Sequence, residues 1–324
     1  MSDSQTEFDT PWKEVLEIYF EDFILFFFPQ AHREIDWTRN PEFLDKELQQ
    51  VVRDAELGKR LVDKLVKVYL IGGEEAWVLV HIEVQSQEES NFAERMFVYH
   101  YRIYDRYRRS VASLAVLGDE SGNWRPNQFD DQLFGSEILF RFPIVKLLDY
   151  KQQESTLEAS RNPFATVVMA HLKAQETRKD GSKRKASKLA LTRRLYELQF
   201  QRQDILNLFR FIDWVMNLPK ALEQEFDQEL SQYEESKRMP YITSIERMRI
   251  EKVREESIKE GIKEGIKEGI LEGISLTLEV KFGSEALNLM PEISQIQDVE
   301  QLRAILVSLK TVTTLEQLRQ IYQQ

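Results

Sequence analysis

The chain contains no cysteine, which excludes disulfides, thiolate metal sites and cysteine nucleophiles. This composition fits a reducing cytoplasm, where we expect the protein to reside. Long apolar runs are missing as well, because the apolar run at residues 23–29 is too short to span a bilayer. The acidic, polar residues 1–14 are not typical of a secretory signal. We therefore expect a soluble protein with no membrane partner.

The chain also has fewer basic residues than acidic ones, 44 Lys and Arg against 55 Asp and Glu. The net charge is −11, which argues against loose binding of polyanions over the whole surface. A protein of this charge that acts on nucleic acid has to concentrate its basic residues locally. One such patch spans residues 173–194 and includes the run RKDGSKRK, and the other interleaves arginines with tyrosines. The second patch consists of Tyr101, Arg102, Tyr104, Arg106, Tyr107, Arg108 and Arg109. Solvated helix faces or loops are the alternative interpretation of both.

Signatures of several enzyme classes are absent from the sequence. There is no glycine-rich phosphate loop, no Ser-His-Asp signature and no zinc pattern. The histidines also form no spaced metal motif; they are His32, His81, His100 and His171. The 324 residues, of which 42% are hydrophobic, are enough for a sizeable core and for two domains, or for one domain with an appendage.

The most informative stretch is a predicted β-hairpin over residues 63–85. Residues 64–71 are rich in β-branched and aromatic side chains, and Gly72-Gly73 supplies the conformational freedom of a tight turn. The run 76–84 is almost entirely apolar, which predicts a central strand buried on both faces.

Acidic residues stand at the open end of this hairpin. Asp63 begins the first strand, and Glu83 and Gln85 end the second on one face. A carboxylate at the end of a buried strand is costly unless it is paired or binds a metal. Two such carboxylates would suit Mg²⁺ or Mn²⁺, which prefer oxygen ligands. Solvated acids at strand ends are the alternative.

The pattern Asp63, hairpin, Glu83-Val84-Gln85 resembles the core of the PD-(D/E)XK nuclease superfamily. More narrowly, the phrase VLVHIEVQSQEESNFAERMFVYHYRIYDRY is typical of the recombination-promoting nuclease and putative transposase family. The resemblance covers residues 10–245, and a weaker one to a small domain of unknown function covers the C-terminal segment. It implies a restriction-endonuclease-like α/β core with a mixed sheet, and a DNA endonuclease linked to recombination or transposition.

The resemblance also implies roles for individual residues. Asp63, Glu83 and the carbonyl of Val84 would bind the metal, Mg²⁺ or Mn²⁺. Gln85 stands where the superfamily usually has Lys, and it offers dipoles in place of a positive charge. Lys67 shares a strand face with Asp63 and is a possible substitute, although lining the strand is the simpler role.

Other side chains are candidates for the same site, and each also has a simpler structural interpretation. His81 shares a face with Glu83, but it would equally serve as a buried, hydrogen-bonded histidine. Arg95, on the following helix, would contact a phosphate or pair with a nearby Glu. The first helix of the superfamily sometimes adds a glutamate to the site. The three possible glutamates, for each of which a helix surface is the simpler place, are Glu14, Glu17 and Glu21.

Periodicity predicts the remaining elements of the core. Helices are expected over residues 12–28, where Pro29 ends the helix, over 41–57 and over 91–109. The helix over 91–109 should bury Phe92, Met96, Tyr99 and Ile103. Residues 111–118 should form a strand parallel to the second hairpin strand. A turn-rich loop over 127–131 and one strand within 135–150 should follow.

Beyond residue 160 the pattern is helical. Helices are expected over 164–174, 188–200, 204–218 and 221–235, with a basic linker at 178–185. We expect a nuclease-like core at 1–160, a helical extension of the same domain at 161–240, a long helix at 241–274 and a small helical domain at 275–324.

Residues 258–274 repeat with a period of four, IKEGIKEGIKEGILEGI. On a helix of 3.6 residues per turn, a period of four makes the isoleucine stripe drift by about 40° per repeat. Each glycine costs up to about 1 kcal/mol relative to alanine, so this helix needs support. Dimerisation through this stretch is one interpretation, because glycine allows backbones to approach closely; a semi-flexible spacer is the other.

Two functions of different class remain. The first is metal-dependent hydrolysis of DNA phosphodiester bonds. The second is a catalytically weak or inactive nuclease-fold module that binds nucleic acid or protein, which the Gln at position 85 and the acidic net charge favour. A requirement for Mg²⁺ or Mn²⁺ distinguishes them.

Overall fold

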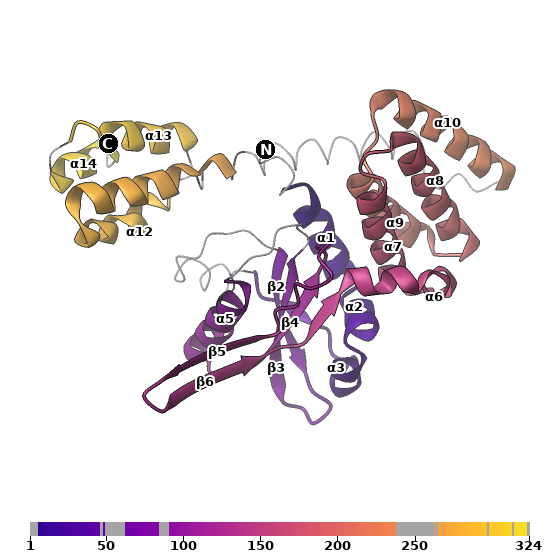
Figure 1. Ribbon diagram of the computed structural model, residues 1–324, viewed down its shortest axis with the longest axis horizontal. Helices are drawn as coiled ribbons and strands as arrows, with labels where there is room; N and C mark the ends of the chain where they lie inside the picture. Colours follow the sequence, from indigo (N-terminus) through magenta and orange to yellow (C-terminus); the bar gives the residue numbers. More distant parts are fainter. Residues whose placement is uncertain are drawn as a thin grey trace. The chain divides into compact units, whose positions relative to one another are not determined.

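The computed structural model describes residues 6–45, 48, 62–83, 91–237, 263, 265–267, 269–296, 298–312 and 314–322, without the side chains of 6–10, 62–63 and 81–83. The chain divides into two compact units, Met1–Arg247 and Met248–Gln324. Within the described ranges, no helix is both long and apolar enough to cross a bilayer. The chain is of the α/β class, and its first unit is built around a mixed five-stranded sheet with the order β1-β2-β3-β4-β7 (Figure 1).

The predicted hairpin is confirmed and forms the middle of this sheet. β2 (Val62–Tyr69) and β3 (Glu75–Glu83) are antiparallel, and Gly73 has a φ of +87° in the turn between them. β4 (Ser110–Leu117) pairs with β3 in parallel, as predicted. β3 is therefore an interior strand, and its described side chains from Trp77 to Val80 are buried.

One face of the sheet is covered by α5 (Phe92–Tyr107), as the sequence predicts. Phe92, Met96, Tyr99 and Ile103 are all buried on its inner side. They pack against alternate residues of three strands, namely Leu65, Trp77, Leu79, Ala115 and Leu117. The odd-numbered positions of β2, β3 and β4 therefore face α5.

The predicted helix over residues 12–28 is instead divided. α1 (Thr6–Ile18) and α2 (Phe20–Phe27) are separated at Tyr19, whose hydroxyl donates to Asp204 at 2.8 Å. Pro29 does not simply end a helix, because it begins α3 (Pro29–Glu34). A proline is favoured at a first helical position, where its missing N–H is not needed.

The segment after α3 also differs from the prediction. Residues 42–43, expected to be helical, form β1 (Glu42–Phe43), which pairs with Lys67 and Val66 of β2. Tertiary pairing with a sheet edge here overrides local helix propensity. Most of the predicted helix 41–57 lies outside the described residues.

A second, two-stranded sheet occurs where a loop and a single strand were expected. β5 (Gln128–Leu133) replaces most of the predicted loop, and it pairs with β6 (Ser136–Arg141). The predicted strand within 135–150 is divided at Pro143 into β6 and β7 (Ile144–Lys146). Proline cannot donate to a strand ladder, but its carbonyl accepts from the amide of Ala115 at 3.0 Å and so leads the chain onto β4.

Helices complete the first unit, and their predicted positions are broadly confirmed. After the 3₁₀ helix Leu147–Gln152, the chain forms α6 (Glu154–Ala159), α7 (Pro163–Glu176), α8 (Gly181–Glu197), α9 (Arg202–Val215) and α10 (Lys220–Lys237). The predicted linker 178–185 was too long. Asp180 accepts a hydrogen bond from the amide of Lys183 at 3.0 Å, and this cap starts α8 at Gly181.

The second unit has a core of its own. A helix over residues 269–282 is followed by the 3₁₀ helix Ser284–Leu289, α12 (Met290–Ile293), α13 (Val299–Ser308) and α14 (Leu315–Tyr322). Ile270, Ile274 and Leu278 are buried in this core, whereas Ile266 is 40% exposed. The outward drift of the isoleucine stripe explains the difference.

The repeat glycines make few close contacts within the unit. A Cβ at Gly273 would meet Leu306 at 3.5 Å, whereas one at Gly265 or Gly269 would meet nothing within 4 Å. A Cβ at any of these three positions would fit without a clash, so close helix packing inside this unit does not account for these glycines. Most of the repeat before residue 263 lies outside the described residues, so dimerisation through it stays a prediction.

We expect Ile274→Ala to destabilise the second unit by about 2–4 kcal/mol, because it removes a fully buried side chain and leaves a cavity. Native-state hydrogen exchange of the α13 amides measures this loss directly. Ile266→Ala is the matched control from the same repeat and should change exchange little, since the side chain is half exposed. Equal effects of the two substitutions would contradict the packing described here.

Candidate functional site

The register of the hairpin brings the predicted acidic positions to one end of the sheet. Asp63 is paired with His81, and Glu83 lies two positions farther along β3. Paired positions, and positions two apart, share a face of the sheet. Positions 63, 81 and 83 therefore belong to the face covered by α5, the face of Leu65 and Leu79. Val84 and Gln85 lie outside the described residues.

A row of paired positions crosses the sheet at this end. Glu83 pairs with Leu117 of β4, and Leu117 pairs with Lys146 of β7. Two strand spacings separate the Cα atoms of Glu83 and Lys146 by roughly 10 Å. Because β3, β4 and β7 run in parallel, their carboxyl ends meet at the same edge. Crevices outside such edges are the usual ligand sites of open α/β sheets.

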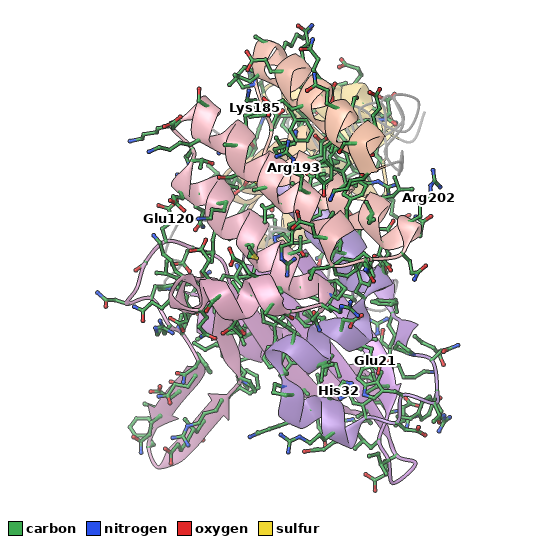
Figure 2. The ribbon with its side chains drawn as sticks, turned by 90° about the vertical axis from the view of Figure 1, so that its right-hand side faces the viewer. Glu21, His32, Glu120, Lys185, Arg193 and Arg202 are labelled. Carbon is green, nitrogen blue, oxygen red and sulfur yellow. The ribbon has the colours of Figure 1, made fainter. Side chains whose placement is uncertain are left out.

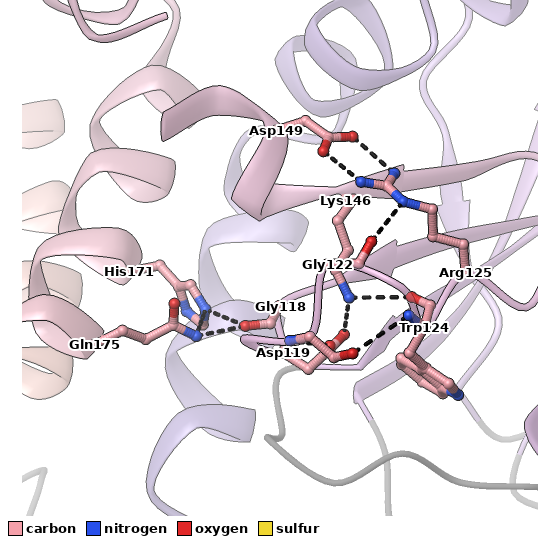
Figure 3. Close-up of polar contacts among 10 residues, drawn as sticks. Gly118, Asp119, Gly122, Trp124, Arg125, Lys146, Asp149, His171 and Gln175 are labelled. Atoms are coloured by element: carbon pink, nitrogen blue, oxygen red, sulfur yellow. Dashed lines mark hydrogen bonds and ion pairs between the residues drawn. The ribbon is translucent and has the colours of Figure 1, made fainter. Parts of the chain in front are cut away.

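A buried ion pair lies at this edge, and the sequence analysis missed it. The Lys146 ammonium is fully buried, pairs with the Asp119 carboxylate and donates to the carbonyl of Trp124 at 3.1 Å (Figure 3). It also lies 5.4 Å from the centroid of the Trp124 ring. Asp119 accepts from the amide of Ser121 at 2.9 Å. A lone lysine in the apolar run IVKLL was the only available sequence signal.

The loop that follows β4 is also held from the helical side. The carbonyl of Gly118 accepts hydrogen bonds from Nε2 of His171, at 2.8 Å, and from the side-chain amide of Gln175, at 2.5 Å (Figure 3). Burial lowers the pKa of His171, so its ring is neutral at pH 7. A carbonyl can only accept, and the proton of this neutral ring is therefore on Nε2. Contacts from α7 and β7 thus fix the loop over residues 118–124.

A second cation lies on the same face of the sheet. Arg95 of α5 is 5% exposed, and its guanidinium is 5.4 Å from the Phe92 ring centroid. Phe92 contacts Trp124 edge-on at 5.3 Å, which connects Arg95 through aromatic rings to the surroundings of Lys146. Arginine in such a place suits a phosphate oxygen or a carboxylate.

Lys67 is not placed to supply a cation beside Asp63. Its ammonium pairs with Glu42 of β1 at 2.6 Å, and this hydrogen bond raises the pKa of Lys67. Four residues of extended chain also put Lys67 roughly 13 Å from Asp63. The structure therefore agrees with the simpler role, in which Lys67 lines the strand.

The glutamates of the first helices form ion pairs away from the face of the sheet that α5 covers. Glu17 pairs with the buried Lys64, which also contacts Asp45 at 3.0 Å. Lys64 has an even number and so faces away from α5. Glu14 lies 3.8 Å from Arg210, and burial raises the pKa of Glu14. Glu21 lies 3.4 Å from His32 (Figure 2).

The arginine- and tyrosine-rich patch at the end of α5 is exposed but partly neutralised. Arg108 pairs with Asp105 at 2.9 Å, and Arg109 pairs with Glu75 at 3.3 Å. Arg106 lies over the Tyr107 ring at 5.7 Å. These cations are therefore available to phosphates only in competition with nearby carboxylates.

Most of the basic segment 173–194 is committed to contacts inside the protein. Lys185 of α8 (labelled in Figure 2) pairs with Glu225 and Glu229. The buried Lys188 pairs with Asp213 and Glu223. Arg194 donates to backbone carbonyls of residues 157, 158 and 160. The segment thus holds α8 against its neighbours, and it does not form a continuous basic surface.

The residues predicted to bind a metal are not among the described side chains. Among the described side chains, no three His, Asp or Glu residues gather closely enough to hold an ion. The described set does not include the side chains of Asp63, His81 and Glu83, on which the prediction rests. The donors that the sequence offers there are carboxylates and a carbonyl, and this set fits a hard divalent cation.

Removal of one partner of the Asp119–Lys146 pair should be strongly destabilising, since it leaves a buried charge uncompensated. We expect Lys146→Met to lower the free energy of unfolding by about 3–5 kcal/mol. Urea unfolding of the first unit measures the change. Arg125→Ala, which breaks the half-exposed pair with Asp149 in the same region, should cost about 1 kcal/mol or less. A mild effect of Lys146→Met would show that the charge is not isolated from water.

Comparisons with known proteins identify no relative of this chain. No protein-family model, no curated protein and no solved structure matches it.

Proposed function

We propose that this chain is a metal-dependent DNA endonuclease with a restriction-endonuclease-like core, of the PD-(D/E)XK type associated with recombination or transposition. The observation that supports this most strongly is the register of β2 and β3. Asp63 is paired with His81, and Glu83 lies two positions beyond His81 on the same face. Asp63 and Glu83 are thus neighbours on adjacent strands at the carboxyl end of β3, as the nuclease pattern requires.

Asp63, Glu83 and the carbonyl of Val84 would hold the ion, Mg²⁺ or Mn²⁺. When bound, such an ion lowers the pKa of a water molecule and polarises the phosphate. Gln85, two positions after Glu83, would orient the attacking water through its side-chain amide.

Positive charge at this end of the sheet would come from neighbouring elements. Gln85 carries no charge, whereas Arg95 and Lys146 are cations on or beside the face of Asp63 and Glu83. Arg95 has the planar guanidinium that suits a phosphate oxygen. Lys146 is bound to Asp119, so we assign it the role of fixing the edge. The exposed end of α5, where tyrosines and arginines are interleaved, lies at the opposite end of β3, where Arg109 pairs with Glu75. DNA bound at the site would have to extend along the length of β3, roughly 26 Å, to contact it.

A second function is favoured by a specific observation. The basic residues of both patches largely pair with carboxylates or carbonyls within the protein. A nuclease fold with Gln85, a net charge of −11 and few free cations would also serve as a binding module with little catalysis. Such a module would bind its partner without a divalent ion.

The decisive experiment is cleavage of supercoiled plasmid by the purified full-length protein in Mg²⁺, Mn²⁺ or EDTA. We expect nicking that requires the divalent ion. The nicking rate should fall at least about a hundredfold in Asp63→Asn and in Glu83→Gln, because the loss of a residue that only supports a metal ligand already lowers metal affinity or activity by about 10–100-fold. Glu74→Gln is the matched control, because Glu74 is exposed in the hairpin turn, at the other end of β3 from Glu83.

Three outcomes separate the two functions. Ion-dependent nicking lost in both variants and kept in the control supports the endonuclease. Cleavage that survives both substitutions contradicts the assigned site. DNA retention in EDTA without cleavage, unchanged by either substitution, indicates the binding module.

The substitution Gln85→Lys tests the role of the unusual residue. Lysine would place a positive charge beside the water and the phosphate, so we expect the cleavage rate to rise by about tenfold or more. Gln85→Met, similar in length but without hydrogen-bonding groups, should lower the rate. The rates are compared under single-turnover conditions. An unchanged rate in both variants would remove position 85 from the proposed site.

A further inference from the structure

The β5–β6 hairpin projects from the rest of the first unit, as Figures 1 and 2 show from two directions. It is a separate two-stranded sheet, and its turn is formed by Phe134 and Gly135, with φ values of +50° and +85°. Positive φ at both central residues is the two-residue turn that matches the twist of a hairpin. The non-glycine residue in this turn, Phe134, is fully exposed.

Only the base of this hairpin is packed. Phe129 stacks on Phe97 of α5 at 4.9 Å, and Phe140 contacts His100 at 4.7 Å. Toward the tip, Leu133, Ile138 and Leu139 are all exposed. A hairpin of two strands is marginally stable in water by itself. Exposed apolar residues on an unsupported hairpin indicate a surface that is covered by a partner.

The outer edge of β6 has unpaired hydrogen-bonding positions. The amide of Phe142 donates to the carbonyl of Asn127 across the base of the hairpin, at 3.0 Å. The N–H and C=O groups of successive strand residues point to alternate sides. The N–H and C=O groups of Ser136, Ile138 and Phe140 therefore point to β5, as those of Phe142 do. The N–H and C=O groups of the residues between them, Glu137, Leu139 and Arg141, point to the outer edge. In the two-stranded sheet, no further strand occupies that edge among the described residues.

The sequence of β6 is self-complementary about Leu139. The strand reads Ser136-Glu-Ile-Leu-Phe-Arg141, and its charged residues, Glu137 and Arg141, are of opposite sign and equally distant from Leu139. Their neighbours across the hairpin are the neutral Gln132 and Gln128. Neither charge is therefore balanced by an acid or base on β5.

We propose that β6 pairs with β6 of a second copy of this chain, antiparallel and with a twofold axis at Leu139. This register sets Glu137 opposite Arg141 twice, Ile138 opposite Phe140 twice, and Leu139 opposite itself. Opposite charges and apolar pairs that lie directly across from each other stabilise antiparallel strands. The outward backbone groups of residues 137, 139 and 141 become hydrogen-bonded, and the two hairpins form one four-stranded sheet.

Other occupants of this edge are disfavoured by charge. The equivalent pairing of β5 about Asp130 would set that carboxylate opposite its own copy. Nucleic acid is also unsuitable, because Asp130, Asp131 and Glu137 give the hairpin a negative charge that Arg141 does not balance. A second β6 is complementary in sign, in apolar character and in strand direction.

The absence of cysteine from the chain allows a direct test in the full-length protein. Leu139→Cys introduces one thiol that lies opposite its own copy. A hydrogen-bonded antiparallel pair has a Cα separation of about 5.5 Å, within the range of a disulfide. We expect mild oxidation to give a covalent dimer on a non-reducing gel. Gln132→Cys, an exposed position on β5 of the same hairpin, is the matched control and should stay monomeric on the gel.

Charge reversal tests the register with little change inside the hairpin. Position 137 faces the neutral Gln132, and Arg141 makes one long hydrogen bond, of 3.5 Å, to the neutral Gln128. By analytical ultracentrifugation, Glu137→Arg and Arg141→Glu should each weaken the dimer by about tenfold or more. The double variant, which exchanges the two charges, should restore it. Asp131→Lys is a charge control on β5 and should leave association unchanged.

Several results would overturn the proposal. A wild-type protein that stays monomeric at high micromolar concentration excludes the dimer. A dimer that resists both single reversals, or that the double variant fails to restore, is formed elsewhere, for example through residues 258–274. Equal cross-linking of Leu139→Cys and Gln132→Cys would indicate random collision in place of a defined register.

Discussion

The register between β2 and β3 is the constraint on which the candidate site depends. Side chains alternate across a sheet, so a slip of one residue would move position 63 to the opposite face from position 83. Leu65 and Leu79 prevent such a slip, because both are fully buried against Tyr99 and Ile103 of α5. The packing of apolar residues in the middle of the hairpin thus determines where its acidic end lies.

Two buried lysines form ion pairs around this hairpin, and only the Lys146–Asp119 pair is buried on both sides. Lys64 binds Glu17 and Asp45 on one face, and Lys146 binds Asp119 at the edge. Burial of a charge is costly, and a pair repays that cost only when geometry and further hydrogen bonds are favourable. Asp119 and Lys146 satisfy this condition through Ser121 and the Trp124 carbonyl. Such pairs are weak evidence for stability, but they fix the loop after β4 beside the row that contains Glu83.

The sequence predicted the hairpin, α5 and β4 because each has a clear apolar period or run. β5 was missed because QFDDQL has no apolar alternation; it is a strand because Phe129 packs on α5 and the Phe134-Gly135 turn closes the hairpin. The position of the acids at one end followed from hairpin geometry. The Asp119–Lys146 pair joins the loop after β4 to β7, and no local sequence pattern indicates a contact between residues so far apart. The α1–α2 break depends likewise on distant contacts of Tyr19, here with Asp204 on α9.

The distribution of charge connects the proposed chemistry with the proposed dimer. The protein is acidic overall, and many of its basic side chains are bound internally, so attraction of DNA cannot come from the surface as a whole. Contacts with phosphate would then be few and confined to the end of the sheet near Arg95 and to the exposed end of α5. The β5–β6 hairpin lies beside α5, through the stacking of Phe129 on Phe97. A twofold axis at Leu139 would place two copies of α5 in one dimer. Two weak phosphate-binding surfaces in one dimer would bind a single DNA duplex more tightly than either surface alone.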